Sequence, residues 1–165
     1  MNSRPSMLVG VVSDTHGLLR PETVTALRGV DHILHAGDVG DPAILDSLRA
    51  IAPVTAIRGN IDRAGLCATL PATEFVELAG KNIYMLHDLS ELDLNPAAAG
   101  VSVIIFGHSH RPQIERREQV WYLNPGSAGP RRFSSPVSLG LLEITDSEIT
   151  PRLVDLTNAV GSSRL

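Results

Sequence analysis

Short apolar runs that alternate with helical segments constrain the fold of this chain more than any other feature of its sequence. Residues 7–13, with the sequence MLVGVVS, are rich in Val and end at polar residues, which is typical of a buried strand. The same pattern predicts strands over residues 31–36 and 53–58. Helices are predicted between these strands, over residues 21–28 and 41–50, because each segment has a proline in its first helical turn. This βαβαβ order predicts a parallel sheet covered by helices.

The second half of the chain is predicted to consist mostly of strands. Residues 73–78 and 81–87 read as two strands joined by Ala79-Gly80, which is typical of a hairpin. Further strands are predicted at residues 101–107, 113–116, 120–124, 137–144 and 148–155. A chain of 165 residues has the size of one domain, so residues 1–165 are expected to form a single α/β domain. Residues 161–165 are expected to be a loose tail.

Composition and charge exclude several classes of protein. The chain has 14 Lys and Arg against 18 Asp and Glu, a net charge of −4, and no basic run longer than two residues, so no nucleic-acid patch is expected. The single cysteine, Cys67, excludes an intramolecular disulfide and a zinc site built from several cysteines. No apolar stretch approaches the length of a membrane-spanning helix. No membrane association is therefore expected, and the cytoplasm is the expected location.

Five of the apolar runs end in side chains that can bind a metal ion. Ligands of open α/β sheets bind beyond the carboxyl ends of the strands, so these side chains are expected to converge. An Asp-x-His or His-x-His segment places two ligands on the same side of an extended chain. Glycines at three of these ends would let the backbone turn sharply as it leaves the strand. The candidate ligands, in chain order, are Asp14, His16, Asp38, Asn60, His87, His108 and His110.

The residues around these ligands form recognisable sequence blocks. Ser13-Asp14-Thr15-His16, Gly37-Asp38, Gly59-Asn60, His87 and Gly107-His108-Ser109-His110 resemble the signature blocks of the calcineurin-like metallophosphoesterases. The later Asn124-Pro125-Gly126-Ser127 and the short chain are similar to the small bacterial and archaeal phosphodiesterases of that family, which share their fold with a eukaryotic retromer subunit. The resemblance implies a four-layer α/β/β/α sandwich, in which two mixed β-sheets are flanked by helices.

The resemblance also implies how the ligands are divided between two metal ions. One ion would be held by Asp14, His16, Asp38 and His110, and the other by Asp38, Asn60, His87 and His108, so that Asp38 bridges them. Imidazole, carboxylate and amide donors without a thiolate independently favour Mn²⁺, Fe²⁺ or Zn²⁺. Manganese is the expected metal, with iron, zinc, nickel and magnesium as alternatives.

The implied activity is hydrolysis of a small phosphate ester, with a phosphodiester favoured over a monoester. A metal-bound hydroxide would be the nucleophile, and no side chain is assigned as a catalytic residue. Asn60 and Arg111 are the expected substrate contacts. The alternative is a protein-binding scaffold of the same fold, like the retromer subunit, but the complete set of ligands favours the enzyme.

Two positions depart from the wider family. Larger relatives carry a His after the Gly-Asn block, as the acid that protonates the leaving group, whereas this chain has Ile61. Leu86 stands where a glycine often precedes the ligand His87. Among the other polar residues, His35 is expected to be a buried, hydrogen-bonded side chain, and Asp62 is expected to cap a turn. A metallo-β-lactamase-type hydrolase is excluded, because Arg111 and Pro112 follow the His-x-His segment.

Overall fold

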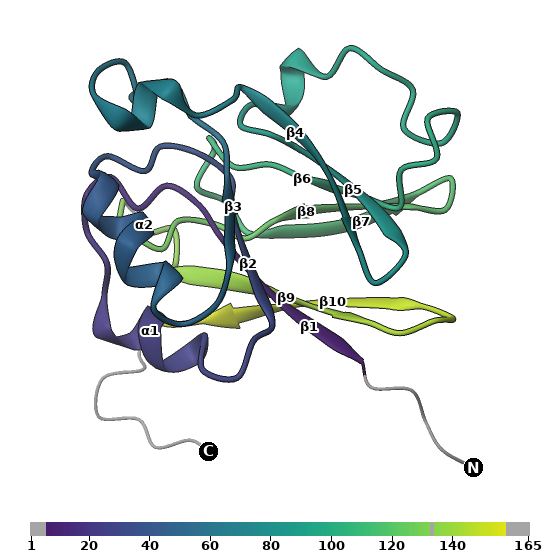
Figure 1. Ribbon diagram of the computed structural model, residues 1–165, viewed down its shortest axis with the longest axis horizontal. Coiled ribbons are helices and arrows are strands. Elements are labelled where there is room, and N and C mark those ends of the chain that lie inside the picture. Colours follow the sequence, from purple (N-terminus) through teal and green to yellow (C-terminus); the bar gives the residue numbers. More distant parts are fainter. Residues whose placement is uncertain (1–5, 133, 158–165) are drawn as a thin grey trace.

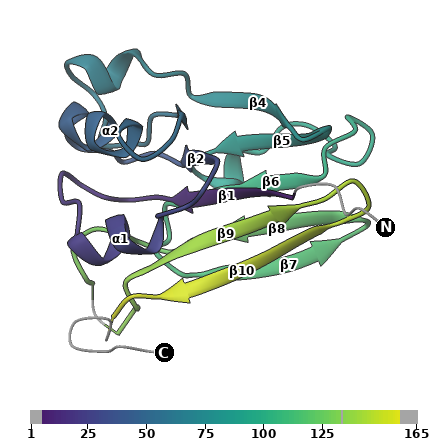
Figure 2. The same ribbon diagram turned by 60° about the horizontal axis from the view of Figure 1, so that its bottom comes forward.

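Two five-stranded β-sheets stacked face to face form the centre of the protein (Figures 1 and 2). The structure is a computed structural model that describes residues 6–132 and 134–157, so the tail expected at 161–165 lies outside the described residues. The elements run β1 (Met7–Val12), α1 (Pro21–Ala26), β2 (His32–His35), α2 (Pro42–Arg49), β3 (Val54–Ala56), β4 (Thr73–Leu78), β5 (Lys81–Leu86), β6 (Val103–Ile105), β7 (Gln113–Arg117), β8 (Val120–Asn124), β9 (Ser138–Ile144) and β10 (Ile149–Asp155). Two short 3₁₀-helices, η1 (Leu66–Thr69) and η2 (Leu89–Glu91), lie in the connections.

The first sheet has the order β10-β9-β1-β2-β3. Its βαβαβ half is parallel as predicted, with Val11 opposite Leu34 and His35 opposite Ala56. Strand β9 pairs with β1 in antiparallel fashion, and β10 closes the edge as the second arm of a hairpin. The sheet is therefore mixed, and its three parallel strands direct their carboxyl ends to one edge.

The second sheet has the order β4-β5-β6-β8-β7 and is also mixed. Strands β5, β6 and β8 are parallel, whereas the outer strands β4 and β7 are antiparallel to their neighbours. The hairpin predicted around Ala79-Gly80 is confirmed, with Leu78 opposite Lys81. The two mixed sheets confirm the predicted fold class.

Apolar side chains fill the space between the sheets and outside each of them. The middle layer contains Val9, Val11 and Leu34 from the first sheet and Ile83 and Ile105 from the second, none of which is exposed. Leu45 and Leu48 of α2 pack with strand residues in a cluster on the outer side of the first sheet. Covering this face with helices is the arrangement that a parallel βαβ segment requires.

The outer face of the second sheet has a thinner cover than the first. A cluster around Tyr84, Ile104 and Tyr122 packs against Leu89, Leu92 and Leu94, which belong to η2 and the chain that follows it. That segment has one helical turn and no α-helix, because Asp93, Asn95 and Pro96 interrupt it. The fourth layer is thus mostly an irregular segment. Among the described residues, no helix is long and apolar enough to cross a bilayer.

Candidate metal centre

The carboxyl ends of five parallel strands, drawn from both sheets, bring the predicted ligands to one edge of the sandwich. Strand β1 precedes Asp14 and His16, β2 precedes Asp38, and β3 precedes Asn60 in the first sheet. Strand β5 precedes His87, and β6 precedes His108 and His110 in the second sheet. Strands β3 and β6 are shorter than predicted, because the chain leaves the sheet after residues 57 and 106 to form the loops that carry Asn60 and His108.

Most of these ligand residues have an unusual backbone conformation. Only eight described non-glycine residues have a positive φ, and three of them, Ala79, Glu118 and Gln119, lie in hairpin turns. The other five are all candidate ligands, with φ between 47° and 71°: Asp14, His16, Asp38, His108 and His110. Such conformations cost on the order of 1–3 kcal/mol each and occur preferentially at functional sites. This clustering therefore marks the ligand loops as a functional site independently of their side-chain chemistry.

Three glycines let the ligand loops approach one another. Gly37 has a positive φ of 102°, as a sharp turn after β2 requires. Gly59 and Gly107 do not have a positive φ, although the chain turns at both, where the Asp62 N–H donates to the Gly59 carbonyl at 3.2 Å and the Ser109 N–H to the Gly107 carbonyl at 2.8 Å. A Cβ atom at Gly59 would collide with Asp38, and one at Gly107 would collide with Ser13 and Asp14. These two glycines are needed because the loops that hold the carboxylates pass directly against them.

Asp14 lies at the centre of the candidate ligands. Its Oδ1 atom is 3.2 Å from Nε2 of His110, 3.6 Å from Nε2 of His16 and 3.8 Å from Nε2 of His87. Its other oxygen, Oδ2, accepts hydrogen bonds from the Ser13 hydroxyl at 2.6 Å and the His108 backbone N–H at 3.1 Å. One oxygen is thus fixed by the protein, and the other faces three imidazoles.

Asp38 lies between one imidazole of each predicted ligand set. Its Oδ2 atom is 3.4 Å from Nε2 of His16 and 3.3 Å from Nε2 of His87, while Oδ1 accepts a hydrogen bond from the Ile61 backbone N–H. Two groups have donor atoms that all lie within 4.8 Å of one another, Asp14 with His16 and His110, and Asp14 with Asp38 and His87. Asp14 is common to both groups, so the bridging role given to Asp38 stays a prediction.

The buried donor atoms of the centre lack partners in the protein. Only five buried side-chain nitrogen or oxygen atoms of the described residues have no hydrogen-bond partner. Four of them belong to candidate ligands: Asp14 Oδ1, His16 Nε2, His87 Nε2 and His110 Nδ1. Buried polar atoms are otherwise almost always paired, so these unpaired ligand atoms, of which His16 Nε2 and His87 Nε2 lie within 3.8 Å of Asp14 Oδ1, indicate a missing partner. A divalent cation fits this set of carboxylate oxygens and imidazole nitrogens.

His87 shows how the chain orients a ligand. Leu86, the last residue of β5, packs on the outer side of the sheet, so the next side chain points the opposite way, toward the centre. The Nδ1–H of His87 donates to the Ala36 carbonyl at 2.7 Å, which leaves Nε2 facing the two carboxylates. A histidine whose second nitrogen is held by a backbone carbonyl is the usual form of a metal-binding histidine.

The electrostatics of the centre show an excess of negative charge. Burial alone would raise the pKa of Asp14, but the neighbouring His110, His16 and Ser13 outweigh it and hold that pKa well below its usual range. Burial alone would lower the pKa of His87, but Asp38 and Asp14 raise it to about 9. The buried carboxylates therefore remain ionised and attract positive charge, either a proton on His87 or a cation.

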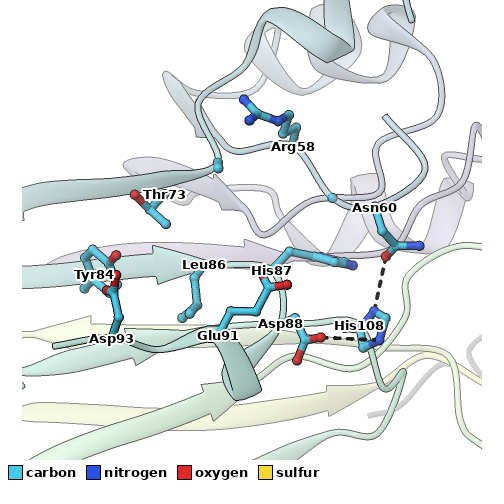
Figure 3. A pocket seen from close by; sticks show the side chains of 12 residues that line it. Arg58, Asn60, Thr73, Tyr84, Leu86, His87, Asp88, Glu91, Asp93 and His108 are labelled. Carbon is cyan, nitrogen blue, oxygen red and sulfur yellow. Dashed lines mark hydrogen bonds and ion pairs between the residues drawn. The ribbon is translucent and has the colours of Figure 1, made fainter. Parts of the chain in front are cut away.

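His108 and Asn60 lie beside the two compact groups and pair with each other. Nδ1 of His108 donates to Oδ1 of Asn60 at 3.2 Å, and both side chains are exposed (Figure 3). The ring of His108 lies edge-on to His87, with 5.3 Å between centroids, and the rings of His16 and His110 are also 5.3 Å apart. Each predicted ligand set therefore contains one close pair of imidazoles.

His35 connects two of the ligand loops. It is fully buried, as expected, and its Nδ1 accepts a hydrogen bond from the Gly37 N–H at 3.2 Å. Its Nε2–H then donates to the Thr15 hydroxyl at 3.0 Å, which donates to the Val39 carbonyl at 2.9 Å. Burial lowers the pKa of His35 to about 4, so the ring is neutral at physiological pH. This chain of hydrogen bonds positions the Asp14 loop against the Asp38 loop.

Asp62 joins the loop after β2 to the loop after β3. It is buried, and its carboxylate accepts hydrogen bonds from the backbone N–H groups of Val39, Gly40 and Gly59 at 2.8 to 3.1 Å. The predicted turn-capping role is thus extended, because the side chain binds the loop after β2 as well as its own. With three backbone donors on it, this carboxylate orients the ligand loops.

The block at residues 124–127 also supports the ligand loops. The Asn124 side chain donates to the Gly107 carbonyl at 3.0 Å and to the Ser109 hydroxyl at 3.1 Å. The Ser127 hydroxyl donates to the Asp14 carbonyl at 3.0 Å. The sequence alone assigned Asn124 and Ser127 no definite role, although the block Asn124-Pro125-Gly126-Ser127, which contributes to the family resemblance, was the available signal. They fix the loops that carry Asp14 and His108.

Two cavities include candidate ligands in their lining. One has a volume of about 390 Å³ and includes Asn60, His87 and His108 in its lining (Figure 3). The other has a volume of about 590 Å³, and His110, Arg111 and Arg132 contribute to its lining. Arg111 is exposed and borders the centre through its neighbour His110. The two expected substrate contacts, Asn60 and Arg111, therefore lie in different cavities.

Comparison with known proteins identifies the family. Residues 7–147 match the calcineurin-like phosphoesterase superfamily domain. The chain belongs to this superfamily. It is 36% identical over 160 residues to a probable metallophosphoesterase of Methanothermobacter thermautotrophicus, covering 90% of this chain and 92% of the relative. It is 29% identical over 156 residues to phosphodiesterase YfcE of Escherichia coli K12, covering 79% of this chain and 84% of that protein.

A solved structure confirms the fold of this superfamily member. Vacuolar protein sorting 29 of Cryptosporidium parvum superposes with a TM-score of 0.74, covering 93% of this chain and 99% of the other at 16% identity. The match over residues 7–147 confirms the family resemblance read from the sequence blocks, and this superposition confirms the fold class.

Proposed function

We propose that this protein is a phosphoesterase that requires two divalent metal ions and acts on phosphodiesters. The observation that carries the proposal is the group of four unpaired buried donor atoms on Asp14, His16, His87 and His110. Membership of the calcineurin-like phosphoesterase superfamily and the similarity to a protein named phosphodiesterase YfcE support the reaction type.

The proposed ligands are the seven residues predicted from the sequence: Asp14, His16, Asp38, Asn60, His87, His108 and His110. When bound, a pair of divalent ions would activate water and neutralise the phosphoryl oxygens. The two carboxylates contribute two negative charges, so a centre with two divalent ions keeps a net charge of +2, which suits an anionic ester. Manganese is proposed as the metal, with iron, zinc, nickel and magnesium as alternatives.

The residues around the ligands hold them in place. Thr15 and His35 fix the loop of Asp14 against that of Asp38, and Asp62 joins the latter to the loop of Asn60. Rigid placement of this kind contributes to catalysis because the groups need no reorganisation when charge develops. Asn60 and Arg111, which line different cavities, are proposed to contact the ester.

Metal analysis combined with a hydrolysis assay tests the proposal. The purified protein is expected to hold up to two equivalents of metal and to hydrolyse bis(4-nitrophenyl) phosphate. A strong chelator should abolish turnover, and Mn²⁺ should restore it. Undiminished turnover in a protein shown to be free of metal would refute the proposed chemistry.

A protein-binding scaffold is the second candidate function, because the fold is similar to that of vacuolar protein sorting 29. The same experiment separates the two functions. Metal-loaded protein that hydrolyses neither mono- nor diesters would favour the scaffold.

A further inference from the structure

His108 is the least buried of the histidines proposed as metal ligands. Its side chain is 47% exposed, against 5% to 17% for His16, His87 and His110. Its backbone is fixed, because its N–H donates to Asp14 Oδ2 at 3.1 Å. The ring, however, has few neighbours to pack against, so its orientation depends on polar contacts.

Two polar side chains flank this ring, one at each nitrogen. Nδ1 of His108 lies 3.2 Å from Oδ1 of Asn60, and Nε2 lies 3.8 Å from Oδ2 of Asp88 (Figure 3). Asn60 Oδ1 and His108 Nδ1 are thus adjacent, and both residues are proposed ligands of the same ion. A ring that binds a metal ion through Nδ1 carries its proton on Nε2, which is the nitrogen that faces Asp88.

Asp88 is held in place by the turn that it begins. It is the N-cap residue of η2, and its Oδ1 accepts hydrogen bonds from the Ser90 N–H at 3.0 Å and the Ser90 hydroxyl at 2.8 Å. The other oxygen, Oδ2, is the one that faces His108. Asp88 also follows the ligand His87 directly, so its backbone belongs to a segment that the centre already positions.

These restraints distinguish the pair of Asp88 and His108 from an ordinary surface ion pair. Surface pairs contribute little to stability, largely because two mobile side chains must be ordered to form them. Here Ser90 orders the carboxylate, and Asn60 orders the imidazole from its other nitrogen. The Asp88 side chain is also only 32% exposed.

We propose that Asp88 is a positioning residue of the metal centre, which orients the His108 ring and keeps its proton on Nε2, so that Nδ1 is available to a metal ion. The inference rests on the proposed dinuclear function and adds a residue to that site. A carboxylate commonly accepts the second N–H of a metal-binding histidine, and loss of such a partner typically lowers metal affinity about 10- to 100-fold. Because Asp88 acts through His108, which belongs to one predicted ligand set, the effect is confined to one of the two ions.

The variant Asp88→Asn tests the proposal through metal affinity. Its amide oxygen can still accept both hydrogen bonds from Ser90, which keeps the N-cap of η2, but the amide nitrogen then replaces Oδ2 and presents a donor to Nε2 of His108. Calorimetric titration of the metal-free wild type with Mn²⁺ is expected to show two equivalents. In the variant, one equivalent should bind about 10- to 100-fold more weakly and the other as in the wild type. Unchanged affinities, or an equal loss for both equivalents, would overturn the proposal.

Two control variants separate the contact from the charge and from the turn. Asp93→Asn makes the same chemical change at an exposed residue that lines the same cavity but lies away from His108 (Figure 3). Ser90→Ala removes one of the two hydrogen bonds to Asp88 and leaves its carboxylate in place. Both controls should bind two equivalents with wild-type affinity. The selective loss in either of them would show that charge or turn stability, rather than the contact with His108, is responsible.

The position of the proton on His108 can be measured in the wild type itself. In protein loaded with the diamagnetic ion Zn²⁺, ¹⁵N NMR of the imidazole should show the metal on Nδ1 and the proton on Nε2. Metal on Nε2 of His108 would overturn the proposal whatever the variants do.

None of these measurements requires a phosphate ester, so they are independent of the proposed activity. A selective loss of one equivalent in Asp88→Asn, in a protein that hydrolyses no ester, would support the role of Asp88 and refute the phosphoesterase. Hydrolysis by a protein whose two metal affinities do not respond to Asp88→Asn would refute the role of Asp88 alone. A wild type that binds fewer than two equivalents would overturn both.

Discussion

The burial of His35 predicts a loss of stability in mild acid that a single substitution should remove. The folded protein keeps this imidazole neutral down to its pKa of about 4, whereas the unfolded chain protonates it near the ordinary value of 6.5. Between these values the unfolded state binds more protons. The stability contributed by the neutral ring is therefore complete above about pH 6.5 and is lost as the pH falls toward 4.

The size of the effect follows from the two pKa values. At pH 5 the unfolded state carries nearly one more proton at this position, which lowers the free energy of unfolding by about 2 kcal/mol relative to pH 7.5. The whole shift, reached below pH 4, corresponds to about 3 kcal/mol. Such a loss is a large part of the stability of a domain of this size.

Urea unfolding of the metal-free protein between pH 4.5 and 7.5 measures this effect. In His35→Asn the amide can still accept the Gly37 N–H but cannot titrate, so its stability should fall with acid about 2 kcal/mol less than that of the wild type. His32→Asn is the matched control, because His32 lies on the same strand but is only half-buried, and burial lowers its pKa less.

Parallel pH profiles for the wild type and His35→Asn would refute the reasoning. A direct check that does not depend on how well the variant folds is NMR titration of the wild-type imidazoles. The His35 ring should show no protonation above about pH 5, given its pKa of about 4.

Three further predictions concern the proposed centre. Asp38→Asn should lower the metal content measured by elemental analysis, because the Asp38 carboxylate faces an imidazole of each ligand set. Cys67→Ser, which changes a buried free thiol, should leave the metal content unchanged. Two full equivalents of metal in the Asp38 variant would exclude Asp38 as the bridging ligand. Gly59→Ala should also reduce metal content and turnover, since its methyl group would displace the Asp38 carboxylate; wild-type metal affinity would contradict the close approach. Ile61 cannot donate a proton to the leaving group, so aryl diesters should be hydrolysed about 10²–10⁴-fold faster than alkyl diesters, and a series of substituted phenyl diesters should slow steeply as the leaving-group pKa rises. A flat series with chemistry rate-limiting would show that another acid serves the leaving group.

Much of the fold could be predicted from the sequence because its strands are short, apolar and bounded by Gly, Pro and Asp. The parallel order of β1, β2 and β3 follows from the helices between them, and the hairpin from Ala79-Gly80. The irregular cover of the second sheet was not predicted. Leu89, Leu92 and Leu94 follow no helical or strand period, so tertiary packing alone assigns them to that face.

The candidate ligands could be predicted because strand ends in parallel sheets converge, but their supports could not. The reason for a glycine at 59 or 107 is the approach of a loop distant in sequence, which no local pattern records. His35 and Thr15 are ordinary residues of a strand and a loop, and only the register of β1 against β2 makes them partners. The sequence around Asp62 likewise predicts only a turn, because the hydrogen bonds that its carboxylate accepts from the loop after β2 depend on the tertiary fold.

The origin of the ligands in two different sheets has a mechanical consequence. Asp14 and Asp38 follow strands of the first sheet, and His87 and His110 follow strands of the second, so the centre spans the seam between the two layers. A cation bound by ligands from both sheets would cross-link the two sheets and resist the sliding of one over the other. It would also close a chain loop of nearly a hundred residues, from Asp14 to His110. Because only the assembled sandwich offers these donors together, release of the ion and separation of the sheets would be one cooperative event.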